Sequence, residues 1–295
     1  MATTQKQTTS WIMPVEFGLP FPGEIESVDK LWWKFHKEVQ EASYSSTQKT
    51  MTVNFLTDAA KLKAMLPQGK GLELRGEPVV SVNFIYQGAL GWLAGRSYDI
   101  VMVTFPVTFN GKERKVHGAF APVIWENMTE PILAGRELLG WSKIYADIEP
   151  PAEMGNSIHC VAGWHGFKFL DLQIDNLRQP DAEEMKASQA AMASEPSEGS
   201  IHWKYIAKTG RPGEADADYL TISTNKGAPP PVIKSFSAWI GDGSIEFHKA
   251  AWQDLPTMAN VVNAFADLEI KDVVSTIVTK TETIGGGMGE TLILE

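Results

Sequence analysis

Lys143 is the residue of this sequence whose neighbours predict unusual reactivity. It follows Trp141 and precedes Ile144 and Tyr145, directly after a predicted helix end at Gly140. Burial beside a tryptophan removes water from an ammonium group and disfavours its charged form, so the pKa of this lysine should fall. A nucleophilic amine needs a pKa of about 7 instead of about 10.4, and full burial can supply that shift. A solvated lysine whose stem packs on the surface is the alternative.

The other reactive side chains match no known pattern of a catalytic or metal site. The six histidines include no HExxH motif and no pair four residues apart on a helix. The glycine-rich run 285–289 leaves no room for the helix that a phosphate loop requires. Cys160 is the single cysteine, which excludes an intramolecular disulfide, and we expect it in the core. We therefore expect neither a metal nor a cofactor.

Composition and charge exclude several classes of protein. The chain has 295 residues, 43% of them hydrophobic, with ten Trp and thirteen Phe, which predicts a folded core and excludes a disordered chain, a collagen and a coiled coil. The net charge of −10, with no basic stripe, argues against nucleic-acid and anionic-membrane partners. No apolar run approaches the roughly 20 residues of a membrane helix, and no signal peptide is visible. Together with the lone cysteine, this predicts a cytoplasmic protein.

The elements that must position Lys143 are mostly strands. Alternating β-branched and aromatic residues predict strands over 77–125, and Asn110-Gly111 predicts a hairpin with a type I′ turn. Thr129, Glu130 and Pro131 predict the start of a short helix over 129–139 that ends at Gly140. Further helices are predicted over 29–42 and 57–66. Further strands are predicted around 158–175, 201–207, 219–224, 232–240, 244–250 and 270–283.

These elements predict one β-rich α+β domain over residues 1–295, in which a sheet wraps a cavity or closes as a barrel. We expect an extended N-terminal segment over 1–25 and a flexible tail over 284–295.

The stretch before Lys143 resembles the acetoacetate decarboxylase family. Gly135-Arg136-Glu137-Leu138, followed by an aromatic residue, one further residue and Lys143, is similar to that family's Gly-Arg-Glu-Leu, spacer and aromatic-Pro-Lys-Lys signature. The likeness extends over roughly 45–283, through segments at 55–58, 105–111, 239–244 and 248–256. It implies an antiparallel sheet or cone-shaped β-barrel with a few flanking helices. It also implies a Schiff-base lysine at Lys143 and a homo-oligomer.

The sequence departs from the family pattern at its charged positions. The family's second lysine is Ile144 here, and its proline is Ser142. The family's strand glutamate falls on Ile100, next to Tyr98 and Asp99. Its early arginine falls on Gln48, and another acidic position falls on Asn83. Burial alone must then lower the pKa of Lys143, and the polar set for a small carboxylate is absent.

We therefore expect a larger and more apolar carbonyl substrate than acetoacetate, in a cavity lined by Trp141, Trp125 and Phe105. The first interpretation is a Schiff-base lyase that acts by decarboxylation or by aldol and dehydration chemistry, with Trp141 and Ile144 desolvating Lys143. The second is a cyclase, isomerase or hydratase of specialised metabolism that uses Tyr98, Asp99 or Glu126 as acid or base. The third is a catalytically silent barrel that binds a small molecule.

Overall fold

The structure, a computed structural model, describes residues 45–186, 197–228, 230–286 and 289–295. The extended segment predicted over 1–25 and the helix predicted over 29–42 lie outside the described residues.

Most of the described chain is sheet, as the alternation of apolar and polar residues predicts. Fifteen strands of the described residues pair into one sheet. They are β1 (Ser45–Leu56), β2 (Leu72–Leu74), β3 (Val79–Leu90), β4 (Arg96–Asn110), β5 (Lys115–Glu126), β6 (Lys143–Tyr145), β7 (Asp147–Ile148), β8 (Ala152–Met154), β9 (Ser157–Trp164), β10 (Phe167–Arg178), β11 (Ser200–Ala207), β12 (Ala215–Ser223), β13 (Val232–Phe247), β14 (Asp272–Ile284) and β15 (Thr291–Leu294).

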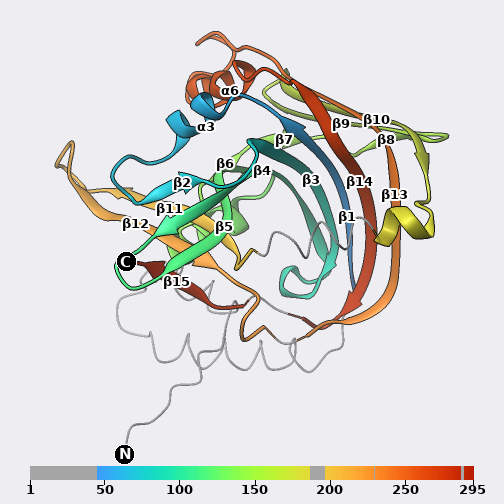
Figure 1. Ribbon diagram of the computed structural model, residues 1–295, viewed down its shortest axis with the longest axis horizontal. Coiled ribbons are helices and arrows are strands. Elements are labelled where there is room, and N and C mark those ends of the chain that lie inside the picture. Colours follow the sequence, from blue (N-terminus) through green and yellow to red (C-terminus); the bar gives the residue numbers. More distant parts are fainter. Residues whose placement is uncertain (1–44, 187–196, 229, 287–288) are drawn as a thin grey trace, which may run out of the picture.

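The strand order is β15-β12-β11-β5-β4-β3-β1-β14-β13-β10-β9-β7, with β2 beside β4, β6 beside β5 and β8 beside β9. The pairs are antiparallel except for β5 with β11 and β5 with β6. The long neighbouring strands β4, β3, β1, β14 and β13 curve together around one side of the molecule (Figure 1). This confirms the predicted β-rich class. The sheet is open, because its end strands β15 and β7 do not pair with each other in the described residues.

The described helices are short. They are α3 (Ala59–Met65), the 3-10 turn η1 (Gly91–Leu93), α4 (Thr129–Ala134), the π-helical turn η2 (Gly135–Leu139) and α6 (Ala259–Ala266), and residues 182–186 are also helical. The predicted helix over 57–66 is confirmed as α3, which Asp58 caps by accepting a hydrogen bond from the Ala60 amide at 2.6 Å. Helices α3 and α6 lie at the same end of the sheet (Figure 1).

The central strands have two different faces. On β1, Met51, Val53 and Phe55 are fully buried in the main hydrophobic core, to which β9, β10, α3 and α6 also contribute. We call this side of β1, β3, β4 and β5 the core face, and the opposite side the second face. Successive side chains of a strand point to opposite sides. Thr50 and Thr52 therefore lie on the second face.

The hairpin predicted at Asn110-Gly111 is present, but its turn differs. Asn110 pairs with Lys115, so the four residues 111–114 form the connection. The Gly111 amide donates a hydrogen bond to the Arg114 carbonyl at 3.1 Å. Neither Asn110 nor Gly111 has a positive φ, so the type I′ prediction is wrong.

Two further predictions need correction. The strands predicted over 232–240 and 244–250 form one strand, β13, because Gly241 lets its backbone approach that of β10 closely. The segment 284–295, predicted as a flexible tail, contributes β15, which pairs with β12. The pairing satisfies backbone hydrogen bonds that a free tail would leave to water.

Candidate active site

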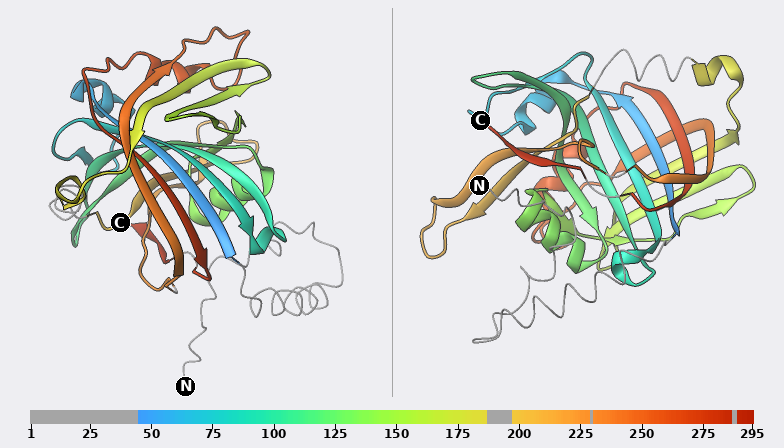
Figure 2. Two further views of the ribbon diagram at one scale, coloured as in Figure 1. Left: turned by 90° about the vertical axis from the view of Figure 1, so that its right-hand side faces the viewer. Right: turned by 90° about the horizontal axis from the view of Figure 1, so that it is seen from below.

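Lys143 lies at the start of β6, which runs parallel to β5 and pairs Lys143 with Ile124. The residue is only 3% exposed, so the predicted burial is confirmed. Helix α4 covers it, because Nζ donates a hydrogen bond to the Pro131 carbonyl at 3.1 Å. Nζ also lies 4.7 Å from the centre of the Trp141 ring, within cation–π distance. Figure 2 shows α4 and η2 beside the ends of the central strands, in green.

A carboxylate pairs with this amine. Glu126 Oε1 lies 2.7 Å from Lys143 Nζ, and the Glu126 side chain is fully buried. Glu126 is the last residue of β5 and lies directly opposite Ile100 on β4. The second oxygen, Oε2, has no hydrogen-bond partner among the described residues.

Burial and pairing act in opposite directions on the two groups. Burial lowers the pKa of Lys143, and the neighbouring Glu126 carboxylate only partly offsets this. Burial raises the pKa of Glu126, and Lys143 partly offsets it. Both directions favour the uncharged forms, a free amine beside a carboxylic acid, because charge separation is costly in a buried site.

The Gly-Arg-Glu-Leu segment shapes the space around the lysine. A Cβ added at Gly135 would lie 2.6 Å from Lys143 Cε and 3.0 Å from Nζ, so only glycine leaves room for this side chain. Arg136 donates a hydrogen bond to the Lys143 carbonyl at 3.1 Å. Gly140 ends η2 with a φ of 76°, as the predicted helix stop requires. At the other end, Met128 and not Thr129 occupies the N-cap of α4.

Trp141 is anchored from the neighbouring strands. Its indole Nε1 donates a hydrogen bond to Ser223 Oγ on β12 at 2.8 Å. Its ring stacks on His202 of β11, with ring centres 5.1 Å apart. His202 is fully buried, and burial, followed by the charge of Lys143, lowers its pKa to about 3. The imidazole is therefore neutral at physiological pH.

An apolar cluster on the second face surrounds the pair. Its buried members are Ile100, Ala121 and Ile124, and Ile85, Tyr98, Met102 and Trp141 pack against them. The pKa of the Tyr98 phenol is raised by burial and by the charge of Glu126. The predicted residues Tyr98, Ile100 and Trp141 therefore share one environment with Lys143.

Asn83 and Gln48 lie on the same second face, farther from the amine along the strand order. Asn83 pairs with Met102 of β4, accepts a hydrogen bond from Thr52 Oγ1 at 2.8 Å and donates one to the Met102 carbonyl. Gln48 is exposed and pairs with Gln87 of β3. The structure places neither in contact with Lys143.

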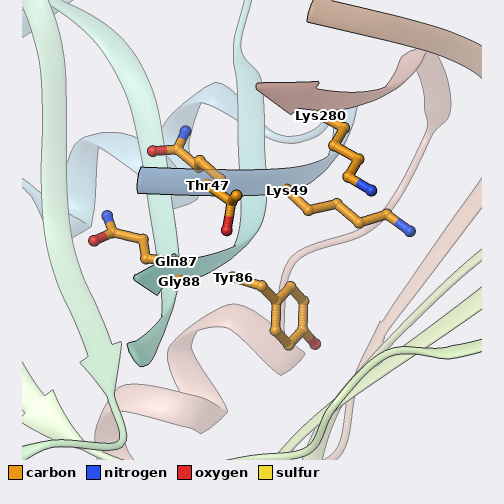
Figure 3. A pocket seen from close by; sticks show the side chains of 7 residues that line it. Thr47, Lys49, Tyr86, Gln87, Gly88 and Lys280 are labelled. Atoms are coloured by element: carbon orange, nitrogen blue, oxygen red, sulfur yellow. The ribbon is translucent and has the colours of Figure 1, made fainter. Parts of the chain in front are cut away.

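Gln48 instead borders a separate surface pocket of about 190 Å³. Lys49 and Lys280 extend in the same direction from neighbouring strands at this pocket (Figure 3). Lys49 forms an ion pair with Glu153 at 2.6 Å. The pocket is lined by Thr47, Gln48, Lys49, Tyr86, Gln87, Gly88 and Lys280, and Lys143 is not one of its lining residues.

Three predicted site residues and one predicted wall residue lie on the core face instead. Trp125 packs against Phe169 and Phe265 in the main core, because it follows Ile124 and precedes Glu126 on β5 and must point the other way.

The same alternation turns Phe105, Ile144 and Asp99 away from Lys143. Phe105 lies in the main core, Ile144 packs against it, and Asp99 pairs with Tyr86 and binds Asn127. Ile144 and Trp125 therefore do not line the site of Lys143.

Sequence reasoning ranked two residues of this site too low. Glu126 entered only as an acid or base of the second interpretation, although its alternation with the apolar Trp125 could have placed it beside Lys143. The sequence assigns His202 to no site, and no local signal links it to Trp141, because their contact depends on the β5–β11 pairing.

The described residues contain no group of three or more His, Cys, Asp and Glu side chains arranged to bind a metal. Among the helices that the structure describes, none is long and apolar enough to span a membrane. What the site offers is an amine, a carboxyl group and a phenol in apolar surroundings, which are groups for carbonyl addition and proton transfer.

Comparisons with known proteins show the family and the fold. The family model described as acetoacetate decarboxylase matches residues 33–290. No curated protein sequence matches the chain. Three solved structures share the fold. The acetoacetate decarboxylase of Legionella pneumophila subsp. pneumophila str. Philadelphia 1 is 22% identical, with a TM-score of 0.58 over 85% of this chain and 88% of that one.

An acetoacetate decarboxylase-like enzyme from Sphingomonas wittichii RW1 is 18% identical, with a TM-score of 0.60 over 86% of this chain and 94% of that one. The enduracididine biosynthesis enzyme MppR, complexed with pyruvate, is 17% identical, with a TM-score of 0.57 over 86% and 91% of the two chains.

Proposed function

We propose, from the premise that this chain belongs to the acetoacetate decarboxylase family, that it is a lyase which acts on a keto compound through a Schiff base at Lys143. The observation that carries the proposal is the buried Lys143 amine, 2.7 Å from the carboxyl group of Glu126. An amine in this environment is a nucleophile at neutral pH because burial disfavours its protonated form.

The two groups together supply what imine formation needs. The Nζ lone pair attacks the carbonyl carbon, and the two hydrogens of the amine leave with the carbonyl oxygen as water. A proton from the Glu126 carboxyl group converts the imine into an iminium ion, and Glu126 is left as the carboxylate beside it. The uncharged pair of the resting site is thus replaced by an ion pair, so no net charge is buried.

The family's second lysine does not contribute to this activation. Ile144 stands at its position, and the Ile144 side chain packs toward the main core. Burial under α4 and Trp141 therefore replaces the neighbouring cation as the cause of the lowered pKa of Lys143.

The surroundings favour a substrate larger and more apolar than acetoacetate. Isoleucines and the Trp141 ring form the cluster next to the amine, and apolar and aromatic surfaces bind apolar bodies. The solved structures of similar fold give precedent for carbonyl ligands, since one of them contains MppR with pyruvate.

Trapping with borohydride tests the proposal. A panel of ketones is incubated with the protein, sodium borohydride reduces any imine to a stable secondary amine, and intact mass spectrometry measures the added mass. We expect adducts on the native chain and none on Lys143→Ala. Lys280→Ala is the matched control, because Lys280 is exposed and lies outside the site, and it should label like the native chain. Failure to trap any carbonyl at Lys143 would refute the proposal and favour a noncovalent isomerase or cyclase, or a binding barrel.

We further propose a cytoplasmic homo-oligomer. The free Cys160 is buried, which fits a reducing compartment. Phe247 stacks on Phe265 in the core and Trp239 packs against that core, so the interface must use other residues of β13. The apolar residues that β13 exposes are Val232, Ile233 and Phe236, at 64%, 62% and 57%.

A further inference from the structure

We infer that Glu126 is the catalytic carboxylate that removes and returns a proton at the carbon beside the Lys143 imine, and that the site takes an uncharged ketone or aldehyde for enamine chemistry. The inference rests on the proposed function and deepens it. It selects aldol and dehydration reactions over decarboxylation.

The position of Glu126 relative to the amine supports this role. Oε1 lies 2.7 Å from Nζ, and the carbon next to the imine carbon is only two bonds from Nζ. A group that contacts Nζ is therefore within reach of the hydrogens on that carbon, the distance that a general base needs. Oε2 has no hydrogen-bond partner among the described residues, so one lone pair of the carboxylate is available to accept a proton.

The protein holds this carboxylate rigidly. Glu126 ends β5 and pairs with Ile100 of β4. The preceding residue, Trp125, packs against Phe169 in the main core. A base on a strand with a buried neighbour keeps its geometry between turnovers, which favours repeated proton transfer at one carbon.

The charges of the second face argue against a substrate carboxylate. A β-keto acid would bring its own carboxylate close to the imine, and Glu126 already occupies that region as an anion once the iminium forms. Two buried anions beside one cation leave one charge unpaired, which is costly. The second face carries uncharged residues on the strands beside and beyond Lys143, namely Tyr98, Ile100 and Met102 of β4, Asn83 and Ile85 of β3, and Thr50 and Thr52 of β1.

The nearby arginines do not supply the missing cation. Arg136 directs a hydrogen bond to the Lys143 carbonyl. Arg96, the first residue of β4 and four residues before Ile100, is exposed and donates to the Leu93 carbonyl. Decarboxylation would also need no base, because the electrons for the enamine come from the carbon–carbon bond that releases CO₂. A base at that carbon is required only where a C–H bond is the one that breaks.

The Glu126 carboxylate takes a proton from the carbon beside the iminium, and the C–H electron pair becomes the carbon–carbon double bond of an enamine. The C=N electrons move to nitrogen, which becomes neutral. The enamine carbon can then attack a second carbonyl, or take the proton back from the Glu126 carboxyl group.

Hydrogen exchange measures this step without the natural substrate. Butanone is incubated with the protein in D₂O, and proton NMR follows the loss of signal from hydrogens beside the carbonyl, while borohydride trapping measures the imine in parallel. We expect the native chain to trap butanone and to exchange its hydrogens. Glu126→Gln should still trap, because loss of the carboxylate removes the influence that raises the pKa of Lys143. Its exchange should fall by about 10² to 10⁴-fold, the usual contribution of a general base.

The controls separate the possible outcomes. Glu130→Gln makes the same change at an exposed glutamate of α4 and should leave both readouts unchanged. Exchange in Glu126→Gln that stays proportional to trapping would overturn the inference and leave the Schiff base intact. Absence of trapping in the native chain would refute the proposed function itself. If Glu126→Gln does not fold, Glu126→Asp, which keeps the charge but withdraws it from the amine, should lower exchange relative to trapping. An unchanged ratio there would also overturn the inference.

Discussion

Glu126 lies directly opposite Ile100 across the β4–β5 pair, and its carboxyl oxygen lies 2.7 Å from Lys143 Nζ. The position that matches the family's strand glutamate is the apolar Ile100. The acidic group is instead Glu126, which reaches the same region of the second face from the neighbouring strand β5. The amine gains an acidic partner that contacts it directly. This relationship determines how the site should respond to mutation and pH.

Replacement of the lysine separates covalent from electrostatic roles. If Lys143 forms an imine, Lys143→Ala and Lys143→Arg should both lose turnover by several orders of magnitude, because arginine keeps its proton and cannot attack a carbonyl. A lysine that only donates a hydrogen bond would lose about 10² to 10³-fold on replacement by alanine and keep much of its activity as arginine. Initial rates on the best trapped ketone measure the difference, with circular dichroism to verify folding. Substantial activity in Lys143→Arg would contradict the Schiff base.

The pH dependence of trapping should reflect the buried pair. The rate depends on the free amine, so it should rise with pH and level off at the lowered pKa of Lys143, below the usual range of a lysine. Glu126 raises that pKa, and its replacement by glutamine should move the midpoint to lower pH. Trapping rates measured from pH 5 to pH 11, in steps of about one pH unit, give the profiles of the native chain and of Glu126→Gln. A midpoint in Glu126→Gln that is equal or higher would mean that the two groups do not interact.

Gly135→Ala should damage both stability and activity. The added Cβ would come within 2.6 Å of Lys143 Cε, so either η2 or the lysine must move. Overpacking of this kind costs about 1 to 3 kcal/mol of unfolding free energy. Urea denaturation measures the loss, and the Gly135→Ala/Lys143→Ala double variant should recover most of it because the crowded side chain is gone. An additive loss in the double variant would argue that the strain lies elsewhere.

Ile144→Lys tests which face of β6 this residue occupies. The sequence pattern predicts that a lysine there restores the family's charge pair beside Lys143. The structure predicts instead a charged group pushed toward the main core, on the other side of the strand. The variant should therefore lose several kcal/mol of stability. Thermal denaturation measures this against Leu133→Lys, an exposed position of α4 where little change is expected. A stable Ile144→Lys chain with faster trapping would support the original prediction.

Assembly should depend on the exposed apolar residues of β13. Phe236 of β13 is 57% exposed. Burial of such an apolar side chain against a second copy of the chain would stabilise an oligomer. Phe236→Asp should shift the protein toward the 32.5 kDa monomer in light scattering at micromolar concentration. Trp252→Asp, at another exposed aromatic residue, serves as the control for a nonspecific effect of charge. A native chain that is already monomeric would refute the oligomer.

The sequence predicted the strands and the reactive lysine because both depend on local patterns. Alternation identified β3, β4 and β5, and the Gly-Arg-Glu-Leu signature identified Lys143. The faces of single residues next to the signature were harder to predict, since Ile144 and Trp125 are as apolar as true wall residues. Only the parallel pairing of β6 with β5 decides that Lys143 and Glu126 share a side while Ile144 and Trp125 take the other.

Contacts between distant strands could not be predicted at all. The stacking of Trp141 on His202 and its bond to Ser223 join residues 61 and 82 positions apart, through strands whose pairing no local pattern specifies. Likewise, 291–294 lacks a strong strand signal and becomes a strand because β12 offers it an edge.

The alternation on β5 has an evolutionary consequence. Trp125 and Glu126 are neighbours on one strand, so the aromatic packing of Trp125 on Phe169 and Phe265 also holds the carboxylate at its distance from the amine. A change at either phenylalanine would shift the strand, and with it the proton-transfer distance, although neither residue faces the site. In related proteins that keep a carboxylate at position 126, residues 125, 169 and 265 should therefore change together. Selection for the proton-transfer distance also acts on these core residues, because their packing sets that distance.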